Sequence, residues 1–187
     1  LGARAGVREV AHIVGLTRPA LLVSDAARHA QASTVVTGTA LRAVLLDESG
    51  DLRIDTAPRP GAAGTLSPLG PDDPFLINST SGTTGLPKCV VHTQNRWHYF
   101  HHKAVANGEL SPDDVFLPVI PTPFGFGIWT SHTTPIHLGT TTVLIERFDA
   151  AATCAAIERH RATVLCCVST QLMMILADDA SRRHDLS

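Results

Sequence analysis

The sequence predicts an α/β fold in which layered sheets are flanked by helices and most strands run parallel. Apolar residues recur at three- and four-residue intervals in several segments, and short apolar or β-branched runs lie between those segments. Glycine, proline and aspartate mark many of the boundaries. The chain has 187 residues, of which 44% are apolar and 17% charged, so it is long enough to bury a substantial core and has the composition of a globular protein.

The first portion, residues 1–46, is predicted to alternate helices and strands. Val7, Val10 and Val14 fall on one face of a helix. The predicted order is helix, strand, helix and strand, over residues 7–14, 20–24, 26–32 and 33–37. Asp25 is expected to cap the second helix, and the last segment is interpreted as a strand because it is rich in β-branched residues.

Residues 47–73 are predicted to form a surface connection between two portions of the chain. The stretch holds four prolines, four glycines and few large apolar residues. Such a composition supplies turns but little material for a core.

The remaining portion, residues 74–187, is predicted to continue the alternation. Strands are expected over residues 75–78, 89–92, 115–120, 140–145 and 163–168. Helices are expected over residues 95–107, 127–138, 150–161 and 170–177. Gly108 ends the first of these helices, Pro135 interrupts the second, and Asp149 caps the third.

The charge and cysteine content exclude several classes of protein. Fifteen basic and 17 acidic residues give a net charge of −2, and the basic residues are scattered, so nucleic acid is not an expected partner. The longest apolar runs are much shorter than the roughly 20 residues of a membrane-spanning helix. Four cysteines without a C-x-x-C pair indicate neither a zinc site nor a disulfide framework, and they favour a reducing, cytoplasmic location. No signal peptide is recognised, and both ends of the sequence are interpreted as internal points of a longer chain.

The segment with the clearest chemical meaning is residues 79–88, Ser-Thr-Ser-Gly-Thr-Thr-Gly-Leu-Pro-Lys, between two predicted strands. Gly82 and Gly85 allow successive backbone N–H groups to turn inward, and the hydroxyls add neutral donors for phosphate oxygens. A lysine ammonium about 4 Å from a phosphate gains roughly 4 kcal/mol at an effective dielectric constant near 20, and Lys88 supplies that cation. A Walker loop is excluded, because Pro87 precedes the lysine and Cys89 follows it. The alternative is a hairpin loop that carries an exposed lysine.

The pattern Thr80-Ser81-Gly82-Thr83-Thr84-Gly85-x-Pro87-Lys88 resembles the phosphate loop of the adenylate-forming, AMP-binding superfamily. That superfamily includes acyl- and aryl-CoA synthetases, luciferases and the adenylation domains of peptide synthetases. Further along, His92-Thr93 with Asn95, Leu117-Pro118 through Gly127, and Arg147-Phe148-Asp149 follow the order and spacing of the family. The chain departs from the family pattern at three positions, which are Ser79, Cys89 and Phe124.

The resemblance implies roles for specific residues. It assigns the binding of the ATP phosphates to Thr80, Ser81, Gly82, Thr83, Thr84, Gly85 and Lys88, with Lys88 also catalytic. Thr84 would contact Mg²⁺. The acyl pocket would be formed by Phe124, Phe126, Gly127 and Trp129, although ordinary core packing is the alternative for these aromatic residues.

The function that the resemblance implies is that of an ATP-dependent carboxylic acid–CoA ligase, which uses ATP, Mg²⁺ and CoA. The chain would be an internal piece of the N-terminal domain of such an enzyme and inactive in isolation. Two alternatives stay open: an adenylation domain that loads a carrier protein, and a non-catalytic, truncated nucleotide-binding module. His98, His101 and His102 are considered as metal ligands, but a helix face without a metal is the default because no acidic or cysteine partner accompanies them.

Overall fold

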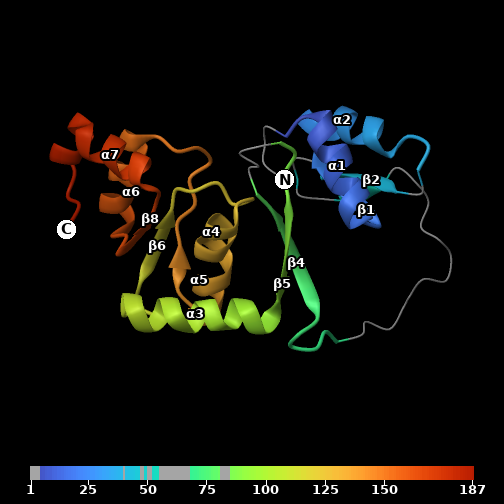
Figure 1. Cartoon of the computed structure of the whole chain (residues 1–187). Helices are drawn as coiled ribbons and strands as arrows, with labels where there is room; N and C mark the ends of the chain where they lie inside the picture. The colour runs from blue at the N-terminus through green and yellow to red at the C-terminus, as the bar shows by residue number, and fades with distance from the viewer. Residues whose placement is uncertain (1–4, 40, 47–48, 50–51, 55–67, 81–84) are drawn as a thin grey trace. The chain divides into compact units, whose positions relative to one another are not determined.

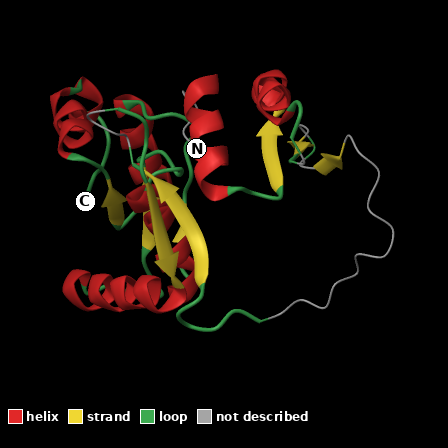
Figure 2. Cartoon of the chain, turned by 45° about the vertical axis from the view of Figure 1, so that its right-hand side comes forward, coloured by secondary structure: helices red, strands yellow, loops and turns green. Residues whose placement is uncertain are grey.

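The computed structural model describes residues 5–39, 41–46, 49, 52–54, 68–80 and 85–187, with only the backbone described over 52–54. Within this part, the chain forms two compact units. The first contains Ala3–Gly70 and Ser79–Val91, and the second contains Pro71–Asn78 and His92–Ser187. Helices and strands alternate along both units, as Figure 2 shows, so the predicted α/β class is confirmed.

The first unit is built on a small sheet in the order β1-β2-β3. Its elements are α1 (Val7–Thr17), β1 (Leu21–Asp25), α2 (Ala26–Val36), β2 (Arg42–Leu46) and β3 (Leu52–Ile54). β1 and β2 run parallel, whereas β3 pairs antiparallel with β2. Helix α2 packs against both parallel strands and α1 packs against α2 (Figure 1). The sequence did not predict β3, which lies in the expected connection.

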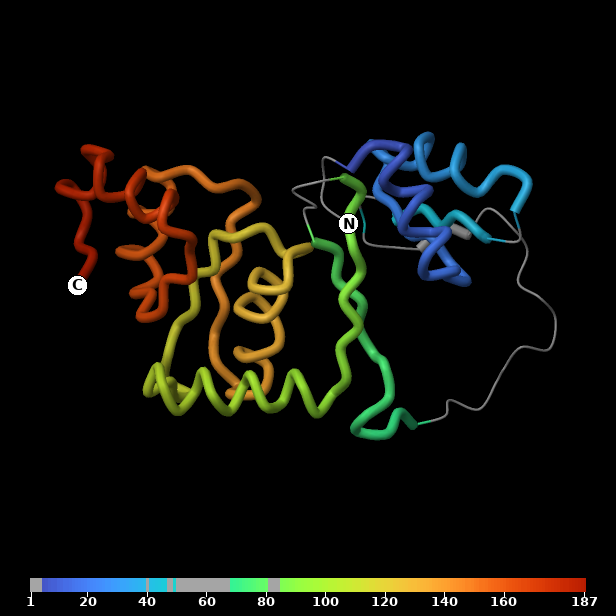
Figure 3. The backbone as a smooth tube through the Cα atoms, viewed as in Figure 1, coloured from blue at the N-terminus to red at the C-terminus, as the bar shows by residue number. Residues whose placement is uncertain are grey.

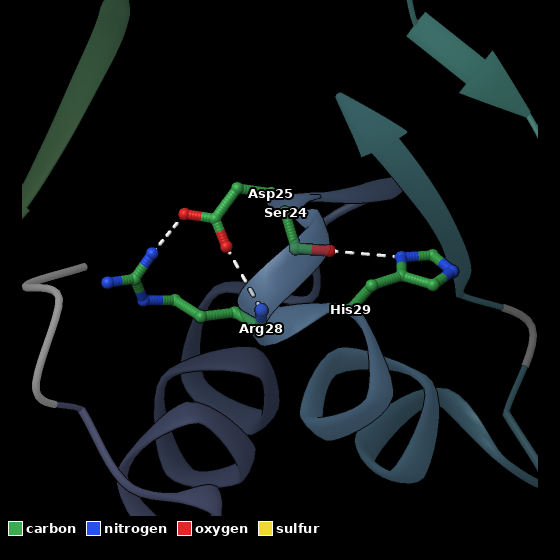
Figure 4. Close-up of polar contacts among 4 residues, drawn as sticks. All are labelled: Ser24, Asp25, Arg28 and His29. Atoms are coloured by element: carbon green, nitrogen blue, oxygen red, sulfur yellow. Dashed lines mark hydrogen bonds and ion pairs between the residues drawn. The ribbon is translucent and has the colours of Figure 1, made fainter. Parts of the chain in front are cut away.

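The turn from β1 into α2 shows why the helix begins where it does (Figure 4). The Asp25 carboxylate accepts a hydrogen bond of 3.0 Å from the backbone N–H of Arg28, which satisfies one of the free amides at the helix start. The other carboxylate oxygen pairs with the Arg28 guanidinium. On the same turn, Ser24 Oγ lies 3.1 Å from His29 Nδ1. The predicted cap is confirmed.

The predicted strand over residues 33–37 is wrong, because α2 continues to Val36. Threonine hydroxyls in this stretch bond back to the preceding turn. Thr34 Oγ1 donates to the carbonyl of Ala30 at 3.0 Å, and Thr37 Oγ1 donates to that of Ser33 at 2.9 Å. These bonds satisfy the hydroxyl groups inside the helix, and the packing of α2 against β1 and β2 overrides the β preference of the branched residues.

The second unit contains most of the remaining elements. Its helices are α3 (Gln94–Gly108), α4 (Gly125–Ile128), α5 (Thr134–Leu138), α6 (Ala150–His160) and α7 (Ser169–Ala177), with a 3₁₀ turn at Asp179–Arg182. Its strands are β6 (Val115–Pro118), β7 (Thr141–Thr142) and β8 (Val164–Cys166). The hairpin of β4 (Pro74–Ser79) and β5 (Cys89–Thr93) carries the chain through the boundary between the units.

A three-stranded parallel sheet, β7-β6-β8, organises the core of the second unit. Leu117 and Val119 are buried against Ala156 and Ile157 of α6. β7 is much shorter than the strand predicted over residues 140–145, although Val143 and Ile145 still pack against this core. Figure 3 follows the chain from these strands through α6 and α7 to the C-terminal end.

The start of the central strand is fixed by a carboxylate. Asp114 Oδ1 accepts a hydrogen bond of 2.7 Å from Thr163 Oγ1, and Asp114 Oδ2 accepts one of 2.7 Å from the Ser111 N–H. The bond with Thr163 is the main reason that the pKa of Asp114 lies below its ordinary value. The contact ties the entry of β6 to the entry of β8.

The helical segment between β6 and β7 is irregular, as predicted, but the irregularity lies before Pro135 and not at Pro135 itself. A π-helical turn, Trp129–Thr133, separates α4 from α5, and Pro135 lies in the first turn of α5, where its missing N–H is tolerated. Gly127 is buried, and a Cβ atom there would clash with the backbone carbonyl of Pro121. The close approach of these two backbone segments therefore requires glycine.

No helix in the described part of the chain has the length and apolar character needed to cross a lipid bilayer.

Candidate functional site

The predicted phosphate loop connects the two strands, β4 and β5, of a β-hairpin. The Thr80 N–H donates a hydrogen bond of 2.9 Å to the Lys88 carbonyl, and the Lys88 N–H donates one of 3.3 Å to Thr80 Oγ1. The two ends of the loop are thus held together at its base. Gly85 has a positive φ of 157°, a conformation that residues with a Cβ atom rarely adopt. Ser81, Gly82, Thr83 and Thr84 lie outside the described residues.

The end of the loop is also held from outside the hairpin. His12 of α1 places Nε2 3.1 Å from the carbonyl oxygen of Pro87, which is buried. Lys88, the next residue, is exposed. The contact fixes the backbone immediately before the lysine and leaves its side chain accessible. The sequence analysis did not identify His12. Its contact with Pro87 joins residues 75 positions apart, and no local pattern indicates such a contact.

A cavity of about 350 Å³ lies in the second unit, within the size range of small-molecule sites, roughly 300–1,000 Å³. Its walls come from β5, from one face of α3, and from α4 and the π-helical turn. The lining residues are His92, Trp97, Phe100, Lys103, Ala104, Asn107, Gly125, Phe126 and Trp129. Four large aromatic side chains make it mainly apolar. Within the lining set, Lys103 supplies the ammonium group.

Several polar atoms in the wall of this cavity are buried without a partner. In the described part of the chain, His92 Nδ1, Trp97 Nε1 and Trp129 Nε1 make no hydrogen bond. Burial, followed by the nearby Arg96 charge, lowers the pKa of His92. A buried donor without a partner costs about 1–3 kcal/mol, and these atoms have almost no accessible surface through which a molecule in the cavity could contact them.

The four predicted pocket residues occupy different positions. Phe126 and Trp129 line the cavity, with ring centroids 6.3 Å apart. Phe124 is 43% exposed just before α4. Gly127 is buried against the turn at Pro121. The structure therefore brings two of the four together in one wall.

Helix α3 supplies cavity residues that no sequence motif singled out. Trp97, Phe100, Ala104 and Asn107 recur at three- and four-residue intervals and face the cavity together. That spacing is visible in the sequence. It does not by itself indicate a site, because an apolar helix face is most often part of a core.

Four imidazole rings lie close together near the face of α3 that points away from the aromatic cavity. His98, His101 and His102 come from α3, and His137 comes from α5. His98 Nε2 and His102 Nε2 are 2.8 Å apart, and the ring of His137 is centred 5.7 Å from that of His98. His101 is buried, and this burial, more than its histidine neighbours, lowers its pKa.

A family model described as AMP-binding enzyme matches residues 1–187. This chain belongs to the AMP-binding enzyme family. The resemblance seen in the loop pattern is thereby confirmed at the level of the family.

Curated relatives of this AMP-binding chain include two CoA ligases. Indoleacetate–CoA ligase of Aromatoleum aromaticum is 40% identical over 120 residues, which cover 64% of this chain and 23% of that protein. 4-Coumarate–CoA ligase-like 5 of Oryza sativa subsp. japonica is 33% identical over 193 residues, which cover 96% of this chain and 34% of that protein. The chain thus spans about a quarter to a third of the length of these relatives.

A solved structure supports the same fold. The amide bond synthetase McbA from Marinactinospora thermotolerans matches all of this AMP-binding chain and 37% of its own, with a TM-score of 0.79 and 28% identity.

Proposed function

We propose that the protein to which this chain belongs is an ATP-dependent carboxylic acid–CoA ligase. The observation that carries the proposal is the loop pattern of residues 79–88 in an AMP-binding chain, with its ends joined by the hydrogen bonds between Thr80 and Lys88. The relatives named CoA ligases support the choice of reaction.

The proposed reaction has two steps. A carboxylate oxygen of the acid attacks the α-phosphorus of ATP, the bond from that phosphorus to its bridging oxygen breaks, and pyrophosphate leaves with the electron pair. The CoA thiolate then attacks the acyl carbon, and AMP leaves. Lys88 and the amides and hydroxyls of residues 80–85 would hold the β- and γ-phosphates and offset the charge that grows on pyrophosphate. Thr84 is proposed to contact Mg²⁺, which would neutralise phosphate charge.

The proposed position of the acid is the cavity lined by Phe126 and Trp129. Its aromatic walls suit an acid with a flat apolar body. Aromatic acids similar to those in the names of the curated relatives are therefore the first substrates to test.

The full-length protein tests the proposal through pyrophosphate release with a panel of aromatic, aliphatic and amino acids. The two lysines of the sequence serve as matched variants. Lys88→Ala is expected to lower kcat/KM for ATP by about 100-fold, because it removes a charge from the transition state. Lys103→Ala, in the cavity wall, is expected to act on the KM for the acid and to leave the KM for ATP within about twofold.

Absence of pyrophosphate release with every acid, or unchanged ATP kinetics in Lys88→Ala, would contradict the proposal.

The acceptor is identified by supplying CoA, a carrier protein or an amine to the preformed acyl adenylate. Thioester formation with CoA is expected. Transfer to a carrier protein alone would favour the loading reaction instead. The four free cysteines support the proposed cytoplasmic location.

A further inference from the structure

The two exposed histidines of α3 are placed to share a ligand. His98 and His102 are four residues apart, so both rings project from one face of the helix. Their Nε2 atoms are 2.8 Å apart and their ring centroids 4.2 Å apart. Two imidazoles at this spacing on a helix form a bidentate pair in known metal sites.

The two nitrogens are at hydrogen-bond distance from each other, close enough for one ion to reach both once the rings turn toward it. A metal–nitrogen bond is about 2.0–2.1 Å long. Imidazole is a ligand of Ni²⁺, Cu²⁺ and Zn²⁺ rather than of Mg²⁺ or Ca²⁺.

The surroundings leave room for the rest of a coordination sphere. A second cavity of about 400 Å³ borders His98 and His137, together with Gln94, Asn95 and Thr133. Across the residues that the structure describes, no three His, Cys, Asp or Glu side chains converge on one point. His102 lies outside this cavity, and both His98 and His102 are exposed, so solvent water can fill the positions that the two histidines leave open.

We propose that His98 and His102 form a bidentate site for a divalent transition metal of the Ni²⁺, Cu²⁺ and Zn²⁺ group. Without the ion, one Nε2–H donates to the other Nε2. On binding, the donor ring carries its proton on Nδ1 and both rings turn, so that both Nε2 lone pairs face the metal. The ion would link two successive turns of α3, the helix whose other residues line the aromatic cavity.

The test is calorimetric titration of the untagged full-length protein with NiCl₂ or ZnCl₂ alone, after dialysis against EDTA. Ni²⁺ is expected to bind at one site at least as tightly as Zn²⁺, and Mg²⁺ is expected to show no binding there. His98→Ala and His102→Ala should each weaken Ni²⁺ binding by about tenfold or more, because a two-point chelate becomes a single contact.

Two other variants serve as controls. His160→Ala removes an exposed histidine at the end of α6 and should leave Ni²⁺ binding unchanged. His137→Ala retains both Nε2 atoms and should change the affinity by less than about threefold. The proposal is overturned if Ni²⁺ binding survives both α3 substitutions, or if it depends on His137 and not on His102. Amide chemical shifts of α3 would show that these variants remain folded.

Discussion

At the scale of single residues, Gly127 is the clearest case of a position fixed by packing. Gly127→Ala should destabilise the second unit by about 1–3 kcal/mol, because the new Cβ atom meets the Pro121 carbonyl and the backbone must shift. Urea unfolding measures the loss.

Gly15→Ala is the matched control, since Gly15 lies inside α1 and a Cβ atom added there would meet nothing within 4 Å. That change should raise stability by roughly 0.5–1 kcal/mol through helix propensity. Equal effects at the two glycines would contradict the packing argument.

Asp114 gives a prediction that depends on pH. Its pKa lies below the ordinary value of 3.8, so the stability it contributes is fully present above that value and disappears as the pH falls through the folded-state pKa. Asp114→Asn should therefore lower the free energy of unfolding at pH 7 by about 1 kcal/mol, and its amide NH₂ would face the Ser111 N–H.

The difference between wild type and Asp114→Asn should shrink below pH 3.8. Denaturant unfolding at several pH values measures it. Asp113→Asn removes the same charge at an exposed neighbour and should show neither effect. A penalty that stayed constant down to acid pH would argue against the carboxylate hydrogen bonds.

At the scale of elements, two substitutions of Asp25 at the start of α2 can distinguish the effect of helix capping from that of an ion pair. Asp25→Ala removes both the bond to the Arg28 N–H and the pair with its guanidinium, and should cost about 1 kcal/mol. Asp25→Asn keeps a capping oxygen and should cost much less, because exposed ion pairs contribute about 0–1 kcal/mol.

Hydrogen exchange of the first α2 amides reports this difference directly. Faster exchange in Asp25→Ala alone is the expected pattern. Equal acceleration in both variants would assign the stability to the ion pair.

Much of the order of elements could be predicted, because caps and periodic apolar residues are local signals. The helices after Asp25 and Asp149 begin where predicted. The strand predicted over residues 33–37 was wrong because β-branched composition is a weak signal that the packing of α2 against the sheet can override. β3 was missed since its three residues are too few to show a pattern.

The candidate site was predictable only in part, for a related reason. The loop pattern stands in consecutive residues, so the sequence reveals it. The contact of His12 with Pro87 and the approach of His137 to α3 join residues far apart in the chain, and no periodicity encodes them. The roles assigned to the loop and pocket residues stay predictions.

At the scale of the whole molecule, the chain passes between its two units more than once. It leaves the first unit after Gly70, returns at Ser79 and leaves again after Val91. The loop segment therefore belongs to the same compact unit as α1, although the sequence places them far apart. This arrangement explains how an N-terminal helix contributes a contact at Pro87.

The 187-residue chain, taken by itself, also exposes apolar side chains on α7. Met173 is 70% exposed and Leu176 62%, and they lie on adjacent turns of the helix. A contiguous apolar surface favours association, so the 187-residue chain should self-associate in light scattering at high concentration.

The double substitution of Met173 and Leu176 to Glu should reduce this association. Thr170→Glu adds charge to the same helix without removing apolar surface, and it should have a smaller effect. Association that resisted the double substitution would place the contact elsewhere.

The π-helical turn at Trp129–Thr133 sets the angular phase between the residues before it and those after it. One residue of an α-helix corresponds to about 100° of rotation. Deleting a residue from the turn would regularise the helix but would swing Phe126 and His137 about the axis relative to each other by that angle. The aromatic wall and the imidazole group could then no longer both face α3. The extra residue in the π-helical turn therefore sets the relative orientation of two groups that share no side chain.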